Sequence, residues 1–517
     1  MKFSLRNPFL VLGVVLSWRV LLLVFTAQPI PANDAFFFDG AVVNWLQHAQ
    51  YFNPTLAIGY PISSGQVFSV YPPGYQVAAF LWMSVFGTSA LSAMTLHLAL
   101  ISVAALLVLF IVRKFFPATN NVALAVWLFF GVTFNDRPED LAHIFGLTAL
   151  LLVTGQISRE RRSPWLAAGI VLSLLLTLYT SLIVGAFYFG AGFLACAAAW
   201  CWRRQAAYFL PFFFTALLFA VITLAVAKLE PVWWQGFLEN ANKQPILRGA
   251  HAPRLVSVLK LIRTLPVFLV ALALVPFVWA RRRQIAVGDY AWFSLMAGIF
   301  AMGWVLMLVT MTLLGPEYVV YAIFVQVLLA AGLLVLVEKY FPAGRNMWRA
   351  IIMGCVLLVS IRAVGMTTWG AACAWKNSYA STQATLRHEW QPFLTSSAPV
   401  VISSPYLYGA TDMGVRHPVH SDWFYDRALT TPNADLDGFM RLRPAKLVVS
   451  QFDYYRSFEP LLAELRLRPE LVEIHVRDLA AVRTPDSMPA MQRVVQHISW
   501  APVIVDLDWK NPSATTP

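Results

Sequence analysis

The sequence predicts a polytopic α-helical membrane protein that ends in a small α/β domain. Its 517 residues are 59% hydrophobic and only 12% charged, whereas soluble globular domains are about 45–50% apolar and about 25% charged. The apolar residues gather in runs long enough to cross a bilayer, and many of the Lys and Arg residues lie in short loops between those runs. The formal net charge of +12 therefore indicates membrane orientation, and nucleic-acid binding is not expected.

About eleven membrane spans follow from the apolar runs and from the charges between them. Lys2 and Arg6 precede the first run, so the N-terminus is expected in the cytoplasm. An odd number of spans then leaves the end of the chain outside. We expect the spans near residues 9–25, 91–112, 121–134, 140–157, 164–180, 182–201, 206–227, 257–280, 290–313, 317–337 and 349–369.

The first outer loop is expected over residues 28–90, which contain no Lys or Arg. Within it, residues 76–88 are apolar but too short to cross a bilayer, which favours an interfacial helix lying along the membrane surface. If residues 76–88 crossed instead, every later basic cluster would change sides, and the charge pattern argues against that.

After about residue 370 the long apolar runs stop and charged residues become frequent. We therefore predict a membrane domain over residues 1–369 and an extracytoplasmic α/β domain over residues 370–517, because strand-like and helical segments alternate there. The four cysteines show neither metal-type spacing nor a disulfide framework. The expected strands are at 399–403, 446–450, 471–476 and 480–483, with a helical stretch at 458–467.

The first outer loop contains two carboxylates beside apolar and aromatic residues, Asp34 and Asp39. An acid at the membrane surface is costly to keep charged, so its presence suggests chemistry. Sugar transfer to a hydroxyl needs a base for the acceptor proton, and Asp34 is the candidate catalytic base. The alternative is that Asp34 caps the helix that follows it. Asp39 is a candidate substrate-binding residue, and the stronger alternative for it is a solvated or hydrogen-bonded acid in a loop.

The second outer loop carries three acids, Asp136, Glu139 and Asp140, at the start of a span. Asp136 and Glu139 fit a capping box. Asp140 is not needed for that cap, and His143 lies three residues on, on the same helix face. We predict Asp140 as a second catalytic residue and His143 as a substrate-binding residue. Together with the first-loop acids they could hold a divalent metal ion, and this possibility stays open.

The outer loop over about 228–263 breaks the positive-inside pattern, because it contains several basic residues. A phosphate leaving group would account for them, since Arg grips phosphate through paired hydrogen bonds and steadies the developing charge. Binding of anionic lipid headgroups is the equally open alternative. The candidates for substrate binding are Lys243, Arg248, His251 and Arg254.

The N-terminal region also carries a set of motifs: Asp34 followed by Phe38 and Ala41, the run Tyr71-Pro72-Pro73, and the pair Phe86-Gly87. In these motifs it resembles the GT-C superfamily of membrane glycosyltransferases that depend on polyprenyl-phosphate sugars. The greatest similarity is to the group of protein O-mannosyltransferases and lipid A aminoarabinose transferases.

The resemblance implies a GT-C-like fold and an inverting transfer of a sugar from a polyprenyl-phosphate donor to a hydroxyl acceptor. It implies Asp34 as the base, Tyr71 among the substrate-binding residues, and the outer face of the bacterial cytoplasmic membrane as the place of reaction. The expected partners are the lipid-linked donor, membrane lipids and a hydroxyl-bearing glycan, lipid or protein.

A polytopic transporter or lipid flippase is the alternative from another functional class, and a non-catalytic scaffold is a third. Transporters carry their important ionisable residues near the middle of the bilayer and often show two related halves. In this chain the notable acids are expected at the outer ends of spans, which favours the enzyme.

Overall fold

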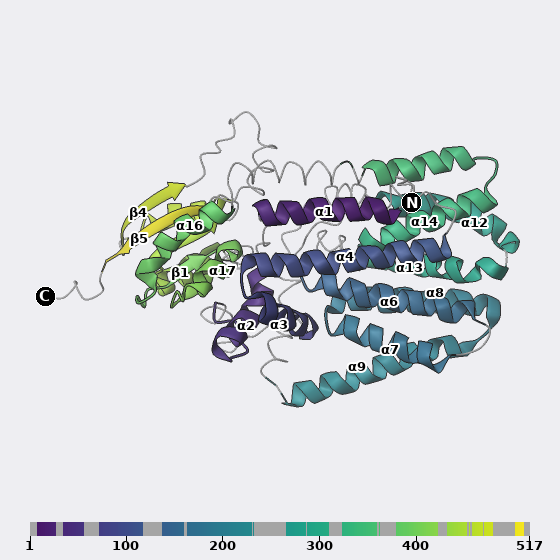
Figure 1. The fold of residues 1–517 in the computed structure, drawn as a ribbon, viewed down its shortest axis with the longest axis horizontal. Coiled ribbons are helices and arrows are strands. Elements are labelled where there is room, and N and C mark those ends of the chain that lie inside the picture. Colours follow the sequence, from purple (N-terminus) through teal and green to yellow (C-terminus); the bar gives the residue numbers. More distant parts are fainter. Residues whose placement is uncertain are drawn as a thin grey trace.

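Membrane-type helices lie side by side in a bundle, and a β-sheet lies beyond one end of that bundle (Figure 1). This arrangement comes from a computed structural model. The residues that it describes are 8–26, 35–55, 72–116, 137–159, 163–229, 231, 265–285, 287–309, 323–358, 361, 379–421, 432–451, 454, 458–468, 470–478 and 502–510.

Five of the described helical segments are long and apolar enough to cross a membrane. Each coincides with a predicted span, so the prediction of a polytopic helical membrane protein is confirmed. The span expected at 121–134 lies outside the described residues, and the total of eleven stays a prediction. The five are α4 (Ala90–Phe115), α6 (Glu139–Ser158), α8 (Leu182–Arg203), Ala206–Leu229, which joins η1 (Ala206–Phe209) to α9 (Leu210–Leu229), and α13 (Tyr290–Val309).

The remaining described helices of the bundle also fall on predicted spans, with shifted ends. The helix expected from residue 257 begins at Pro266, because Pro suits the first helical position, where its missing N–H is not needed. These helices are α1 (Pro8–Thr26), α7 (Pro164–Leu178), α12 (Pro266–Arg281), α14 (Ile323–Tyr340) and a helix over 345–358.

Local sequence signals account for the ends of these helices. The Ser89 hydroxyl accepts a hydrogen bond from the Ser92 amide (3.2 Å) and caps the start of α4, while Arg113 and Lys114 lie in its last turn. Between α8 and α13 the backbones approach closely. A Cβ at Gly298 would collide with the Ala191 carbonyl, so a small residue is required there.

Two shorter helices, α2 (Ala35–His48) and α3 (Gly74–Phe86), pack together at the end of the bundle that lies next to the sheet (Figure 1). The 13 residues of α3 span about 20 Å, which is too short to cross a bilayer. The helix ends at Gly87, whose N–H still donates to the Met83 carbonyl and whose positive φ of 81° turns the chain out of the helix. The sequence predicted a helix of this kind over 76–88, and its place at a membrane surface stays a prediction.

The C-terminal part contains a five-stranded sheet of order β2-β1-β3-β5-β4. Strands β2, β1 and β3 are parallel, and β5 and β4 add in antiparallel pairs. The strands are β1 (Val400–Ile402), β2 (Pro418–His420), β3 (Lys446–Ser450), β4 (Leu471–Asp478) and β5 (Pro502–Trp509), with helices α16 (Tyr379–Trp390), α17 (Ser404–Asp412), α19 (Pro432–Leu442) and α21 (Glu459–Leu465).

Three of the predicted strands correspond to β1, β3 and β4, and the predicted helical stretch corresponds to α21. The fourth predicted strand, at 480–483, and the domain boundary near residue 370 lie outside the described residues. Strands β2 and β5 were not predicted. β2 is only three residues long, which is too short for a periodic signal.

An ionic cluster ties α16 to the antiparallel side of the sheet. Arg477 donates to both carboxylate oxygens of Glu389 (2.8 and 2.9 Å) and to Asp506 (2.9 Å), and Lys446 bridges the same two acids. Hydrogen bonds from Arg477 hold the pKa of the Glu389 carboxyl down at about 2, with help from Lys446 and against the opposing effect of burial.

Replacing Glu389 by Gln should lower the free energy of unfolding at neutral pH by about 1–2 kcal/mol, because two cations lose a shared anion. A depressed pKa means that the carboxylate adds stability above its ordinary pKa of about 4.3 and loses that contribution as the pH falls toward 2. The difference in melting temperature between wild type and Glu389→Gln in detergent should therefore shrink over this window. Glu464→Gln, at an exposed position, is the control and should change the melting temperature little. A constant difference for Glu389→Gln would contradict the assignment.

Candidate active site

Asp39 is buried inside α2, with 1% of its surface exposed. The Tyr75 hydroxyl donates to Asp39 Oδ1 (2.8 Å), and the Tyr408 hydroxyl donates to Asp39 Oδ2 (2.6 Å). The expectation of a loop acid is therefore wrong about the loop and about solvation, and right about hydrogen bonding. Asp39 lies in a helix because Phe36, Phe37 and Phe38, which precede it, supply the apolar face that this helix buries.

The hydrogen bonds continue from Asp39 to the second predicted acid. Tyr75 oxygen lies 2.8 Å from His97 Nε2, and His97 Nδ1 lies 2.9 Å from Asp140 Oδ2. All five residues are almost fully buried. Together, Asp39, Tyr75, His97, Asp140 and Tyr408 form what we call the Asp39–Asp140 network.

Five elements build this network, one residue each. Tyr75 and Asp140 are the second residues of α3 and α6, so both side chains lie at helix starts. A carboxylate at the start of a helix is favoured by the helix dipole. His97 comes from α4 between them, and Tyr408 comes from α17 of the C-terminal part.

The proton inventory of the network follows from its donors. Tyr75 has one hydroxyl proton and gives it to Asp39, so its oxygen accepts from His97 Nε2–H. The His97–Asp140 pair then shares one further proton, either as imidazolium with carboxylate or as imidazole with carboxylic acid. With Asp39 ionised, both forms give the network a net charge of −1.

Burial raises the pKa of the Asp39 carboxyl above its ordinary value. The neighbouring His97 and the hydrogen bonds from Tyr408 and Tyr75 oppose this rise, since they favour the ionised form. Burial outweighs these partners, and without the two tyrosine donors the ionised form of Asp39 would be still less favoured.

The first turn of α2 is held from two further sides. The Phe36 amide donates to Ser404 Oγ (2.7 Å), and Asn53 Nδ2 donates to the Phe36 carbonyl (3.0 Å). Asn53 Oδ1 in turn accepts from the amide and the hydroxyl of Thr55 (3.1 and 2.7 Å). Asn53 also lies against Gly40, where any Cβ would collide with its amide group.

His143 does not join the network, although it lies three residues after Asp140. Its Nδ1 lies 2.9 Å from the Tyr188 hydroxyl on α8, and its ring packs against Phe324 with centroids 4.7 Å apart. Gly146 leaves room for the Tyr188 ring, because a Cβ there would collide with it. The structure therefore brings Asp39 and Asp140 together and places His143 in a separate buried pair.

The other predicted site residues lie outside the described part of the chain. Two of them directly precede described residues. Asp34 precedes Ala35, which begins α2, and Tyr71 precedes Pro72, which is buried. Those outside are Asp34, Tyr71, Lys243, Arg248, His251 and Arg254.

The described acids of the network do not have the arrangement of a metal site. Both oxygens of Asp39 accept from tyrosine hydroxyls, and Asp140 faces a histidine. Within the described ranges, three ligand-type side chains come together only at Glu473, His475 and Asp508, which are exposed on β4 and β5. A divalent ion at the Asp39–Asp140 network would therefore have to draw on residues outside those ranges.

Sequence reasoning missed Tyr75, His97, Ser404 and Tyr408. His97 carried a usable signal, because an ionisable residue inside an apolar span is expensive and usually functional. Tyr75 follows the Pro-Pro run closely, but tyrosine at a helix start is common. Ser404 and Tyr408 gave no local signal, since their partners lie 368 and 369 residues earlier.

No family model matches the chain, and no curated protein matches it either. In fold, it is similar to the crystal structure of ArnT, an aminoarabinose transferase, from Cupriavidus metallidurans bound to undecaprenyl phosphate. The TM-score is 0.51 at 13% identity, over 98% of this chain and 99% of that one. The chain has a GT-C fold. The resemblance predicted from the N-terminal motifs is thereby confirmed at the level of the fold.

Two further structures score lower. The apo state of the same Cupriavidus metallidurans protein gives a TM-score of 0.48 at 13% identity, over 96% of this chain and 97% of that one. The Archaeoglobus fulgidus oligosaccharyltransferase in complex with Zn and sulfate gives 0.46 at 12% identity, over 85% of this chain and 68% of that one.

Removing the Tyr75 hydroxyl should destabilise this GT-C fold. Tyr75→Phe takes a shared partner from two buried groups, Asp39 and His97, and should cost about 2–3 kcal/mol in the free energy of unfolding. Tyr290→Phe is the matched control, because the half-buried Tyr290 ring keeps its stacking on Trp202 and should change stability by less than about 0.5 kcal/mol. Unfolding in mixed micelles measures both, and equal effects would count against a buried network.

Proposed function

We propose that this protein is an inverting membrane glycosyltransferase. It moves a sugar from a polyprenyl-phosphate donor to a hydroxyl acceptor at the outer face of the bacterial cytoplasmic membrane, with Asp34 as the base. The observation that carries the proposal is the anchoring of α2. This helix begins at the residue after Asp34, and the buried Asp39–Asp140 network fixes it. Catalysis by a positioned base needs such a rigid support.

The proposed reaction is a single displacement. The acceptor oxygen attacks the anomeric carbon, the bond from that carbon to the phosphate oxygen breaks, and polyprenyl phosphate leaves with the electron pair. Asp34 takes the proton of the acceptor hydroxyl as the new bond forms. Because attack and departure take place on opposite faces, the configuration at the anomeric carbon inverts.

The first turn of α2 favours the base over the helix cap for Asp34. A capping carboxylate accepts from the amide of the second or third helical residue. The amide of the second residue, Phe36, already donates to Ser404 Oγ. One of the two donors that a cap would use therefore has another partner.

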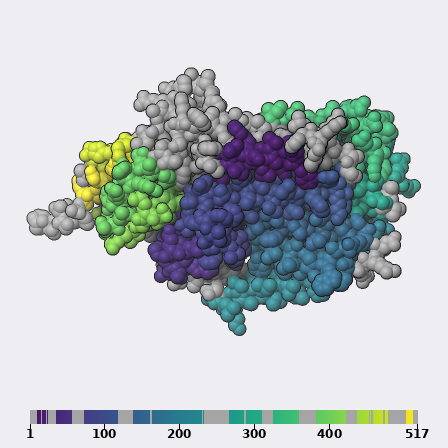
Figure 2. All heavy atoms as spheres, in the orientation of Figure 1, coloured from purple at the N-terminus to yellow at the C-terminus, as the bar shows by residue number. Residues whose placement is uncertain are grey.

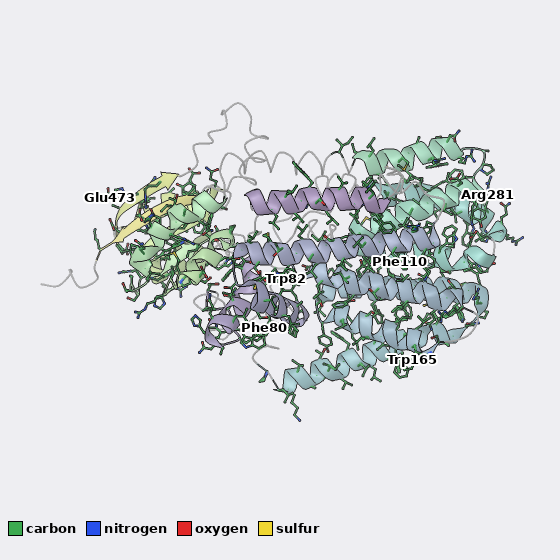
Figure 3. The ribbon with its side chains drawn as sticks, in the orientation of Figure 1. Phe80, Trp82, Phe110, Trp165, Arg281 and Glu473 are labelled. Atoms are coloured by element: carbon green, nitrogen blue, oxygen red, sulfur yellow. The ribbon has the colours of Figure 1, made fainter. Side chains whose placement is uncertain are left out.

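The charges of the helix ends support an outer position for this site. Basic residues lie in the last turns of α4, α8 and α12, where Arg113, Arg203 and Arg281 are found. Figure 3 shows Arg281 at the end of the bundle far from Glu473 of the sheet. Because basic residues favour the cytoplasmic side, the opposite end, with α2, α3 and the sheet, is proposed to face outward.

The leaving phosphate is proposed to bind the basic outer loop, through Lys243, Arg248, His251 and Arg254, with Tyr71 nearby in the first loop. Asp140 is proposed to support the site through His97, since it is 3% exposed and hydrogen-bonded. The buried acids lie in α2 and at the start of α6, near one end of the bundle. A transporter would be expected to carry them near its middle.

Asp34→Asn tests the base directly. The variant should fold normally and lose at least about 100-fold in the rate of sugar transfer, because only proton removal is lost. Mass spectrometry of envelope glycans from a deletion strain identifies the missing sugar, and transfer by the purified protein in vesicles then gives the rate. Asp412→Asn, at an exposed position, is the matched control and should transfer at the wild-type rate. If Asp34→Asn fully restored the missing glycan in the deletion strain, Asp34 would not be the catalytic base. A transporter or a scaffold would give that result.

Arg248→Lys distinguishes specific hydrogen bonding of Arg248 to the donor phosphate from nonspecific electrostatic binding of anionic lipid headgroups. Lysine keeps the charge but cannot form the paired hydrogen bonds, so the KM for the donor should rise about tenfold if Arg248 grips phosphate. Donor titration with wild type, Arg248→Lys and Arg248→Ala measures this, with Arg283→Lys, at an exposed position next to α12, as the control. Headgroup binding would instead give a Lys variant equal to wild type beside an impaired Ala variant.

A further inference from the structure

The C-terminal sheet meets the first outer loop along the carboxyl ends of its parallel strands. Residues from the carboxyl end of β2, and from α17 directly after β1, form buried hydrogen bonds with the loop. In Figure 2 the surface of this part of the C-terminal region lies directly against that of α2 and α3. The bonds join the Phe36 amide to Ser404 Oγ (2.7 Å), Asp39 Oδ2 to the Tyr408 hydroxyl (2.6 Å) and the Thr55 carbonyl to the His420 amide (3.2 Å).

The sheet holds α17 firmly in this position. Ser403, which links β1 to α17, donates its amide to the Val448 carbonyl of β3 (3.0 Å), and its hydroxyl accepts from the Ser450 amide (3.0 Å). Ser404 and Tyr408 are four residues apart, so both face the same side of α17, toward α2. The rings of Phe36 and Tyr408 also meet edge to face, with centroids 4.9 Å apart.

These contacts act on the part of α2 that matters most for the proposed chemistry. Phe36 is the second residue of α2, and Asp39 lies one turn further on. Both are 1% exposed, and Ser404 and Tyr408 are buried as well. The start of α2 is thus fixed by groups that the membrane helices do not supply.

We infer that Ser404 and Tyr408 are positioning residues of the transferase, through which the C-terminal domain sets the place of the catalytic base. Ser404 holds the amide of the second residue of α2, and Tyr408 holds the carboxylate of Asp39, which Tyr75 ties to the bundle. Neither residue is expected to touch the sugar. This role rests on the proposed function, since it concerns the geometry of Asp34 during transfer.

Tyr408→Phe is the central test, because it removes one hydroxyl and keeps the ring against Phe36. The kcat for sugar transfer, measured well below the melting temperature, should fall about 10- to 100-fold while the KM for the donor stays unchanged. If Tyr408 acts through Asp39, the double variant Tyr408→Phe/Asp39→Asn should lose no more than the more impaired of the two single variants. Thr411→Val is the control, since Thr411 Oγ1 donates to the Leu407 and Tyr408 carbonyls of its own helix. It should lower the melting temperature and leave kcat unchanged.

A second measurement does not depend on activity. Ser404→Ala removes the acceptor of the Phe36 amide, so hydrogen exchange in the peptide over 35–48 should become at least tenfold faster. Exchange in the first turns of α4 should stay as in wild type.

Three results would overturn the inference: an unchanged kcat in Tyr408→Phe, a loss of kcat that Thr411→Val reproduces at equal loss of stability, or unchanged exchange in Ser404→Ala. An inactive wild-type protein would instead reject the proposed function, and with it any role of these residues in turnover. The exchange measurement would then still decide whether α17 fixes α2.

Discussion

The end of the bundle next to the sheet depends on the burial of the Asp39 carboxyl group. An ionised carboxylate without partners is very costly to bury, and the cost becomes tolerable only when hydrogen-bond donors replace water. Here both donors are tyrosine hydroxyls, from α3 and from α17. The two donors belong to different elements, so the burial of the Asp39 carboxyl group constrains how α2, α3 and the C-terminal sheet come together.

The same constraint passes on to the bundle. Tyr75 donates to Asp39 from its position at the start of α3, where the Gly74 N–H donates a hydrogen bond to the Tyr179 carbonyl (2.8 Å). The absence of a side chain at Gly74 allows this approach, because a Cβ would lie 2.7 Å from that carbonyl oxygen. His97 and Asp140 then compensate each other across α4 and α6. With Asp39 ionised, the five side chains of the Asp39–Asp140 network together carry one negative charge.

Hydropathy and charge were sufficient to predict the helices of the bundle, because a span is a local property of about 20 apolar residues. They were not sufficient for the site. Asp39 was assigned to a loop because residues 28–90, which contain no Lys or Arg, were expected to form the first outer loop. The pairing of Asp39 with Tyr408 joins residues 369 positions apart, and no periodicity or spacing reports such a contact. Strand β5 was missed as well, although it carries a local strand signal: Val503, Ile504 and Val505 are β-branched, and apolar residues and acids alternate from Val505 to Trp509.

The anchoring of α2 also follows from the length of this helix. Isolated helices shorter than about 12–15 residues are marginal in water, and α2 has 14 residues. By contrast, α4 has 26 residues, its own serine cap and basic residues in its last turn, so its sequence specifies it locally. The order of α2 must therefore come from its tertiary contacts with Asn53, Tyr75, Ser404 and Tyr408. These contacts reach α2 both from the C-terminal sheet region, through Ser404 and Tyr408, and from the helical bundle, through Tyr75.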